Sequence, residues 1–519
     1  MTGKKVILLI LDGWGQGEEN ISNPFRFTKT PNLDYLQKNY PFCLLNASGY
    51  TVGLTSDQPG YCEIGHLTLG TSIVFYQTLT KIDLSIENGD FFKNKKLKQI
   101  FNHCRTFNSR LHLVGLLSQE NNISEFNHLI ALLELANQEK FKNIYLHLFT
   151  DGLDSPPKSA LSLIEKLERI QVSKNLPGKI ATLCGRFYAL DKTNNYFLRT
   201  QRAFLLLVEG KGNLAKNPKE LLKEKYLDPN FNDSLLEPTI FDLDGKIQNN
   251  DALLFFHHET KNIFQLANAF LNPDFKEFKR PARENLFIAS LAKYLEIDYP
   301  VIFEEQKIKT NLSRVIAEKK LRQIKIIDES RKELLSFYFN GFFEEKHPNE
   351  VFKFLSSFSE EKDLITETEK FFNYLKVIIK EEIFDFMVAS LPTFDIIGHK
   401  GDFRLAISAI EEIDKLLGEL FQIILENNYS LILTSDHGNI EKMIKTESGQ
   451  KETLHNLSPV PFYLIDKNYY RERSKEELAF FKRKALGSLI DVAPTILDLM
   501  GIEIPQEFMG KSLLRYFKK

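Results

Sequence analysis

The sequence is poor in cysteine, contains no long apolar run and carries almost no net charge. Its 519 residues include only four cysteines and no pairing pattern among them, which predicts a reducing, cytoplasmic setting. No apolar run approaches the roughly 20 residues of a membrane helix. The short run at the N-terminus leads directly into Asp12, so no signal peptide is expected. The formal net charge of −2 gives no reason to expect nucleic acid as a partner.

Length and apolar patterning predict an α/β protein with two domains or more. A chain of 519 residues is too long for one ordinary core. One regular alternation of strands and helices begins near residue 76 and closes with the strand 252–256, and a second begins near residue 311. The expected strands are 6–11, 110–118, 143–149, 179–183, 252–256, 324–327, 336–339, 384–390 and 430–433. The expected helices include 128–136, 156–169 and 403–427.

Acidic and imidazole side chains follow several of these apolar runs. Asp12 ends the first run, where α/β sheets keep their chemistry, although on its own it could equally cap a turn. The others are Asp395 and His399 in D-I-I-G-H, Asp436 and His437 in S-D-H-G-N, and His455 in a later loop. Each motif alone could be an ion pair or a turn. Together they predict a site for two divalent ions about 4 Å apart, which would hold the attacking and leaving oxygens of a phosphoryl group.

Cys62 lies between Gly60 and Gly65, beside an expected helix start. A helix N-terminus lowers the pKa of a thiol and attracts phosphate, so Cys62 is a candidate nucleophile. A small inert side chain is the alternative interpretation of an isolated cysteine.

The chain resembles the cofactor-independent phosphoglycerate mutases of the alkaline phosphatase superfamily. The matching stretches run from one end to the other and include LILDGWG, KTPNLDYL, ASGYTVGL, DSPPKSAL, IIGHKGD, TSDHGN, SPVPF and DVAPTILDLMGIE. The resemblance implies a phosphatase-like metal domain formed by both chain ends, residues 1–76 and 311–519. It also implies an α/β phosphotransferase domain inserted between them, residues 77–310.

The resemblance further implies roles for the candidate residues. One metal ion would take Asp395, His399 and His455. The other would take Asp12, Asp436, His437 and the nucleophile. The family's nucleophile is a serine in G-N-S-E-x-G-H, and the residue at that position here is Cys62. Manganese is the ion expected from the family, and a thiolate ligand makes zinc an alternative.

The residues that hold phosphoglycerate in the family are largely replaced. Ile123 stands at the position of a histidine, Leu153 at that of an arginine in D-G-R-D, and Glu259 at that of an arginine in F-R-P-D-R. Losing one charged contact to a phosphate costs about 10²-fold or more. The substrate-binding candidates that remain are Asp154, Arg186, Lys192 (an arginine in the family) and Arg331, which aligns with a lysine.

Three hypotheses follow from this pattern. The protein could interconvert 3- and 2-phosphoglycerate in glycolysis, transfer or hydrolyse another phosphoester with the same metal chemistry, or be a non-catalytic metal-binding paralogue. The sulfatase modification of cysteine is not expected, because Cys62 is not followed by the C-x-P-x-R signal. A small phosphorylated metabolite is the expected partner, and a monomer the expected state.

Overall fold

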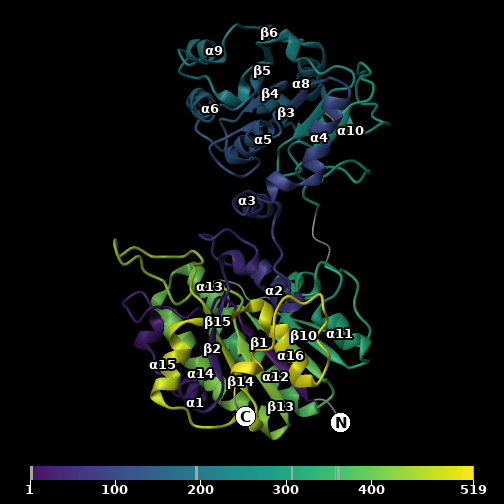
Figure 1. The fold of residues 1–519 in the computed structure, drawn as a ribbon. Helices are drawn as coiled ribbons and strands as arrows, with labels where there is room; N and C mark the ends of the chain where they lie inside the picture. Colours follow the sequence, from purple (N-terminus) through teal and green to yellow (C-terminus); the bar gives the residue numbers. More distant parts are fainter. Residues whose placement is uncertain (1–3, 193–196, 305–307, 357, 359–362, 518–519) are drawn as a thin grey trace. The chain divides into compact units, whose positions relative to one another are not determined.

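The computed structural model describes residues 4–192, 197–304, 308–356, 358 and 363–517, which fold into two compact units (Figure 1). The first unit combines Met1–Gln77 with Gln306–Lys519, so both halves of the chain contribute to it. The second, the inserted unit, is Thr78–Glu305. Each contains a largely parallel sheet with helices packed against it, which confirms the α/β fold class.

The first unit is built on an eight-stranded sheet in the order β11-β10-β12-β1-β13-β14-β2-β15. Its strands are β1 (Lys5–Leu11), β2 (Phe42–Asn46), β10 (Gln323–Asp328), β11 (Glu350–Leu355), β12 (Phe386–Leu391), β13 (Tyr429–Thr434), β14 (Val460–Ile465) and β15 (Ala485–Ser488). Strand β1 lies between β12 and β13 and is parallel to both. Its apolar residues are all buried, as expected of a strand covered on both faces.

Helices flank this sheet. They are α1 (Pro31–Asn39), α2 (Cys62–Thr71), α11 (Leu312–Glu318), α12 (Leu364–Glu381), α13 (Thr393–Lys400), α14 (Phe403–Glu426), α15 (Lys475–Arg483) and α16 (Val492–Met500). Helix α14 packs its apolar stripe against β13 and α12, while α2 packs against α16. The predicted helix 403–427 is therefore a core helix, as its spacing of leucine and isoleucine indicates.

One predicted strand is wrong. Residues 336–339 do not pair in the sheet but belong to a π-helical turn, Leu334–Tyr338, in which the N–H of Phe339 donates to the carbonyl of Leu334. The aromatic residues favour a strand by composition. The segment follows β10 too closely for the crossover that another parallel strand would need, so the chain continues as a helical turn.

The inserted unit contains a seven-stranded sheet in the order β6-β7-β5-β4-β3-β8-β9. Its strands are β3 (Leu111–Leu117), β4 (Ile144–Thr150), β5 (Lys179–Gly185), β6 (Asn213–Leu214), β7 (Thr239–Ile240), β8 (Ala252–Phe255) and β9 (Phe287–Ser290). The sequence analysis ends this series at β8 and misses β9, a short strand at the edge of the sheet.

Helices cover both faces of this second sheet. They are α3 (Thr78–Glu87), α4 (Lys95–Thr106), α5 (Phe126–Gln138), α6 (Ala160–Lys174), α7 (Arg186–Ala189), α8 (Phe197–Glu209), α9 (Pro218–Lys225) and α10 (Phe264–Leu271). Alternate residues of β8 join two different apolar clusters: Leu254 packs in one and Leu253 in the other. This alternation shows that the sheet has a core on each side.

A network of buried, hydrogen-bonded polar side chains crosses the strands of the inserted unit. Nε2 of His112 donates to Asp251 at 3.1 Å, so Nδ1 of His112 accepts from Nε2 of His147 at 2.9 Å. Nδ1 of His147 in turn accepts the hydroxyl of Thr182 at 2.9 Å. Asp251, which begins this network, also pairs with Arg110, whose Nη2 lies 2.9 Å from Oδ2 of Asp251. Each imidazole is thereby held neutral in one tautomer.

Several buried histidines make the stability of the inserted unit depend on pH. Burial lowers the pKa of His112, and lowers that of His257 to about 3 and that of His258 to about 4. A histidine whose folded pKa lies below its unfolded value of about 6.5 contributes stability above that value and loses it as the pH falls toward the folded pKa. We expect each to reduce the free energy of unfolding by about 1.4 kcal/mol per pH unit below about 6.5.

Urea unfolding of the full chain at neutral and mildly acidic pH tests this expectation. The single tryptophan, Trp14, is buried in the first unit, so its fluorescence reports that unit, while far-ultraviolet circular dichroism reports both. The variant His257→Gln keeps an acceptor for the N–H of Leu116 without a titrating group, and we expect a shallower pH dependence. His103→Gln, at a half-buried position of α4, serves as the control. An unchanged pH dependence in His257→Gln would show that protonation of His257 does not make the stability of this unit depend on pH.

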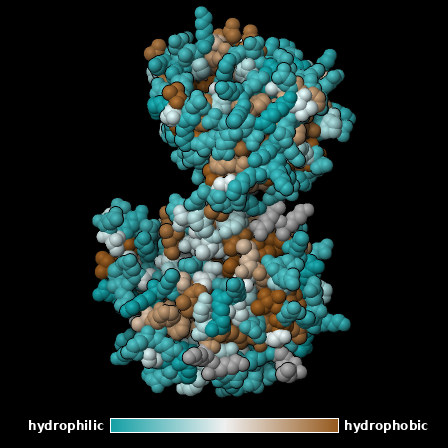
Figure 2. Space-filling view, in the orientation of Figure 1, coloured by the Kyte–Doolittle hydropathy of each residue, from teal (hydrophilic) through white to brown (hydrophobic). Residues whose placement is uncertain are grey.

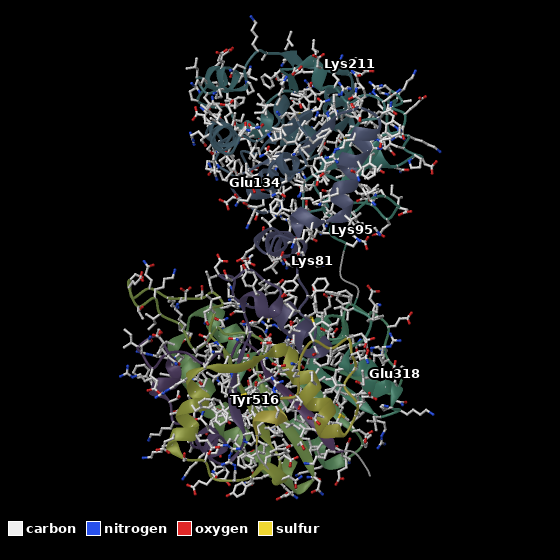
Figure 3. All side chains as sticks on the ribbon, in the orientation of Figure 1. Lys81, Lys95, Glu134, Lys211, Glu318 and Tyr516 are labelled. Carbon is white, nitrogen blue, oxygen red and sulfur yellow. The ribbon has the colours of Figure 1, made fainter. Side chains whose placement is uncertain are left out.

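Hydrophilic side chains cover most of the face drawn in Figure 2. Among the described residues, no helix combines the length and the apolar character that crossing a membrane requires. Surface ion pairs include Lys174–Glu134 at 2.5 Å and Arg314–Glu318 at 3.0 Å, and both glutamates are labelled in Figure 3. Pairs of this kind contribute about 0–1 kcal/mol each, so the three apolar clusters account for most of the stability.

Candidate metal centre

Three parallel strands of the first unit end at the same edge of its sheet. Asp12 follows β1, Asp436 and His437 follow β13, and α13 begins two residues after β12. Asp395 and His399 lie one turn apart on α13, so both side chains project from one face of the helix. The N–H of Asp395 also donates to the carbonyl of Asp12 at 3.0 Å. The predicted acidic and imidazole residues are therefore brought together by the sheet itself.

Helix α2 delivers Cys62 to this edge. Cys62 is the first residue of the helix, and its Sγ lies 3.2 Å from Nε2 of His437 and 3.5 Å from Oδ1 of Asp12. Gly65 makes this approach possible, because a Cβ there would come within 2.6 Å of the carbonyl oxygen of Asp436. Any larger residue would push α2, and with it Cys62, away from the carboxylates.

The first set of ligand atoms, the Cys62 group, comprises Asp12, Cys62, Asp436 and His437. Nε2 of His437 lies 3.2 Å from Oδ1 of Asp12 and 3.6 Å from Oδ2 of Asp436. The carboxylate of Asp436 is fully buried, and its Oδ2 lies 3.2 Å from Nδ1 of His66. A tetrahedral ion with bonds of about 2.0–2.3 Å keeps its ligand atoms about 3.3–3.8 Å apart. The distances among Asp12, Cys62 and His437 fit such an ion, and Asp395 is the fourth residue whose ligand atom lies within 4.8 Å of these three.

The second set, the His455 group, comprises Asp395, His399 and His455. Oδ1 of Asp395 lies 3.3 Å from Nε2 of each histidine, and the two Nε2 atoms are 3.0 Å apart. Nδ1 of His399 donates to the carbonyl of Thr453, and Nδ1 of His455 donates to that of Gly60, each at 2.9 Å. In the neutral rings both Nε2 atoms are therefore lone-pair acceptors facing each other. This arrangement is unfavourable without a cation and is typical of metal-binding histidines.

The two sets share a strongly anionic pocket. Burial, together with the charges of Asp436 and Asp395, raises the pKa of Asp12. Burial alone would lower the pKa of His437, but the carboxylates of Asp436 and Asp12 outweigh it and raise this pKa to about 10. Burial raises the pKa of the Cys62 thiol well above its ordinary value, and Asp12 raises it further. The carboxylates of Asp12, Asp395 and Asp436 raise the pKa of His437 and of Cys62, so the pocket favours bound positive charge.

Arg331 lies inside this pocket. Its Nη1 is 3.1 Å from Oδ2 of Asp12, and its Nη2 is 3.1 Å from Oδ2 of Asp395. The sequence analysis groups Arg331 with the substrate-binding residues, whereas the structure places its guanidinium between carboxylates of the two ligand sets. Its side chain keeps 24% of its surface exposed, so one edge still faces solvent.

His66 is a functional residue that the sequence analysis does not single out. It is fully buried, its Nδ1 donates to the carbonyl of Cys62 at 2.8 Å and lies 3.2 Å from Oδ2 of Asp436, and its Nε2 is 3.0 Å from the hydroxyl of Ser390. His66 thus joins the start of α2 to the strand end that carries Asp436. The only sequence signal is its place in the Cys62–His66 stretch, four residues after the thiol.

We expect His66→Ala to weaken metal binding at the Cys62 group about 10–100-fold, the usual effect of losing a group that orients a ligand. His66→Asn should recover part of this affinity, because its amide N–H can replace Nδ1. Competition with a chelator measures both affinities, and thermal unfolding of the metal-free variants separates them from a loss of folding. Equal affinities in His66→Ala and the parent would show that His66 does not orient the ligands.

In the inserted unit, two of the predicted substrate residues meet at the end of its sheet. Nη1 of Arg186 lies 2.5 Å from Oδ1 of Asp151 and 2.7 Å from Oδ2 of Asp154, and the arginine side chain is 10% exposed. Because these carboxylates neutralise the positive charge of Arg186, the arginine attracts an anion less strongly. Lys192 is exposed and lines a pocket of about 430 Å³ together with Lys261 and Thr260.

The three positions at which the resemblance implies a clamp residue have other surroundings in this structure. Ile123 packs in an apolar cluster with 3% of its surface exposed. Leu153 is 67% exposed. Glu259 accepts the backbone N–H groups of Lys261 at 2.7 Å and Asn262 at 3.0 Å, and so stabilises its own turn. None of these three side chains offers a positive charge to a phosphate.

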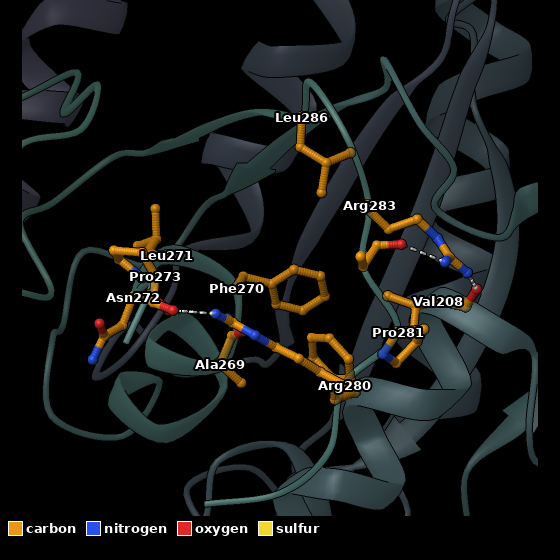
Figure 4. Close-up of a pocket in the computed structure, with 12 residues that line it drawn as sticks. Val208, Ala269, Phe270, Leu271, Asn272, Pro273, Arg280, Pro281, Arg283 and Leu286 are labelled. Carbon is orange, nitrogen blue, oxygen red and sulfur yellow. Dashed lines mark hydrogen bonds between the residues drawn. The ribbon is translucent and has the colours of Figure 1, made fainter. Parts of the chain in front are cut away.

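Another cavity of the inserted unit, about 400 Å³, is lined by Arg280 and Arg283 (Figure 4). Arg280 donates to the carbonyls of Ala269 at 2.5 Å and Asn272 at 2.6 Å, and Arg283 donates to that of Val208 at 2.7 Å. These carbonyls lie at or near the C-terminal ends of α10 and α8. The arginines therefore cap helix ends, which accounts for them structurally.

Comparisons with known proteins agree with this geometry. Residues 82–296 match the family model described as the BPG-independent PGAM N-terminus, and residues 288–502 match the Sulfatase family model. The 2,3-bisphosphoglycerate-independent phosphoglycerate mutase of Clostridium novyi (strain NT) is 35% identical, covering 99% of this chain and 100% of its own length. The chain belongs to this family. The phosphoglycerate mutase of Moorella thermoacetica is 36% identical over 98% of each chain.

A solved structure of this mutase family shares the fold. The phosphoglycerate mutase of Leishmania mexicana aligns with a TM-score of 0.51 and 23% identity, covering 98% of this chain and 97% of its own. The resemblance seen in the sequence is thus confirmed, as is the combination of an alkaline phosphatase-like domain with a phosphoglycerate mutase domain.

Proposed function

We propose that this protein is a metal-dependent phosphoryl-transfer enzyme that interconverts 3- and 2-phosphoglycerate in the cytoplasm, with Cys62 as its nucleophile. The observation that supports this most directly is the convergence of Asp12, Cys62, Asp436 and His437 beside Asp395, His399 and His455. The identity to phosphoglycerate mutases over nearly the whole chain supports the reaction and the substrate.

The residues fit two divalent ions in charge as well as in spacing. A Cys62 thiolate and the carboxylates of Asp12, Asp395 and Asp436 carry four negative charges, which two divalent ions neutralise. Arg331 then leaves the pocket with a net positive charge, which favours a phosphate. When bound, the ions would lower the pKa of the thiol and stabilise charge on the phosphoryl oxygens.

Cys62 would carry the phosphoryl group between the two hydroxyls of glycerate. Its sulfur forms a bond to phosphorus as the bond from phosphorus to the glycerate oxygen breaks, and the proton lost from sulfur ends on that oxygen. The second half reverses these changes at the other hydroxyl. His66 holds the backbone of Cys62, and the N-terminus of α2 directs its N–H groups toward the phosphate.

A second candidate is phosphoryl transfer to or from a different phosphoester. It is favoured by the inserted unit, where Arg186 is bound to Asp151 and Asp154, Leu153 is exposed, and Glu259 stands at a clamp position. This arrangement offers little positive charge to a second anionic group. It is compatible with a substrate that carries the phosphoryl group but no carboxylate.

The test measures bound metal, mutase activity and hydrolysis on one preparation. The protein is loaded with manganese, cobalt or zinc, and assayed for 2-phosphoglycerate formation from 3-phosphoglycerate and for cleavage of an aryl phosphate. We expect two ions per chain and mutase turnover. Hydrolysis alone would favour the second candidate. Two bound ions with neither activity would contradict both and indicate a non-catalytic paralogue.

A further inference from the structure

The two ligand groups differ in their donor atoms. The Cys62 group has a sulfur, an imidazole nitrogen and the carboxylate of Asp12 close together, with Asp436 beside His437, whereas the His455 group has two imidazole nitrogens. The carboxylate of Asp395 lies within 4.8 Å of the ligand atoms of both groups. A thiolate favours zinc and cobalt over manganese and magnesium. Sites of imidazole and carboxylate accept all of these ions. The sulfur of Cys62 therefore gives the two groups different preferences among divalent ions.

The two ligand groups also differ in solvent exposure and in the number of donor atoms that the protein supplies. Asp12, Asp436 and His437 have no exposed surface, and with Cys62 they provide the four donors of a complete tetrahedral site. The His455 group provides three donors, and the side chain of His399 is 45% exposed. A buried site with four protein donors releases its ion slowly, whereas a partly exposed site with three keeps a position for water or substrate.

We infer that the Cys62 group is a zinc-selective position and the His455 group an exchangeable one, so that the protein works with a mixed pair of ions. This inference rests on the proposed function, because it assigns ions to the same two positions. It predicts that zinc enters the Cys62 group first and stays there, while manganese or cobalt exchanges at the His455 group.

The geometry of the Cys62 group supports a bond to sulfur. Sγ of Cys62 lies 3.2 Å from Nε2 of His437 and 3.5 Å from Oδ1 of Asp12, close to the edges of a tetrahedron around one ion. These neighbours are an imidazole and a carboxylate, both of which are metal-ligating side chains. The carbonyl of Cys62 is fixed by His66, so the thiol is held toward the group.

Cobalt is the probe, because a cobalt–thiolate bond gives a charge-transfer band in the near ultraviolet. Metal-free protein is titrated with cobalt, and the band should rise to completion with the first equivalent. One equivalent of zinc should then abolish it, and a large excess of manganese should not. Cys62→Ser should still bind two ions but lose the band and the preference for zinc. Cys104→Ala, which changes a buried cysteine of the inserted unit, should keep both.

The outcomes separate this inference from the proposed function. Two bound cobalt ions without the band, or a preference for zinc that survives in Cys62→Ser, would overturn the selectivity and leave the metal-dependent reaction standing. Failure to bind any divalent ion would overturn both. A band that appears only with the second equivalent would reverse the assigned order and so contradict the inference.

Discussion

Asp436→Asn is expected to remove one divalent ion per chain and to lower phosphoryl-transfer activity about 10³-fold or more. Asp436 is fully buried, and its Oδ2 lies 3.6 Å from Nε2 of His437 and 3.2 Å from Nδ1 of His66, so its carboxylate faces the Cys62 group. Removing one group that stabilises charge in a transition state costs about 10²–10³-fold, and here an ion would be lost with it. Metal analysis after dialysis and the coupled mutase assay measure the two effects.

The control for this variant is Asp90→Asn, a largely exposed carboxylate of the inserted unit whose loss should change neither value. The rise in Tm that metal produces should also shrink in Asp436→Asn, because an ion that binds only the folded state stabilises it. Unchanged metal content in Asp436→Asn would remove this residue from the ligand set. Unchanged activity with one ion missing would show that the reaction needs only the other.

Cys62→Ala is expected to abolish activity, by about 10⁴-fold or more, whereas Cys62→Ser should retain it. Alanine has no atom that can accept a phosphoryl group, and losing the nucleophile is among the most damaging changes an enzyme can suffer. A serine hydroxyl occupies the same place at the start of α2 and is the nucleophile that the family resemblance implies. Mass spectrometry of rapidly quenched parent protein should find the phosphoryl group on the peptide that contains Cys62.

Full activity in Cys62→Ala would exclude the thiol from the reaction. Alkylation offers an independent test, since bound metal should slow the modification of Cys62 by occupying its sulfur. The other three cysteines are fully buried and provide an internal reference in the same digest. Equal alkylation rates with and without metal would show that the sulfur is not a ligand.

The fold could be predicted because its central strands are recognisable in the sequence as apolar runs. The run from Val6 to Leu11 is apolar without interruption, and a strand of that kind lies in the middle of a parallel sheet. The carboxyl ends of parallel neighbours meet at one edge, so Asp12 and Asp436 were expected together. The error at residues 336–339 has the opposite cause, since aromatic composition favours a strand there but chain connectivity does not allow one.

Other parts of the site depend on contacts that no local pattern records. The carbonyls of Thr453 and Gly60, which fix the tautomers of His399 and His455, could be any backbone groups. The family resemblance groups Arg331 with the substrate residues, whereas in the structure η6 (Glu329–Arg331) follows β10 directly and Nη1 of Arg331 lies 3.1 Å from Asp12. The roles of these residues as ligands remain predictions from sequence and geometry.

The hydrogen bond from His455 to Gly60 links the two ligand groups to each other. Gly60 lies two residues before Cys62, so the loop that carries His455 and the turn that presents Cys62 are held by one contact of 2.9 Å. An ion that holds His455 would also restrict the turn that presents Cys62, and any coupling between the two positions would be reciprocal.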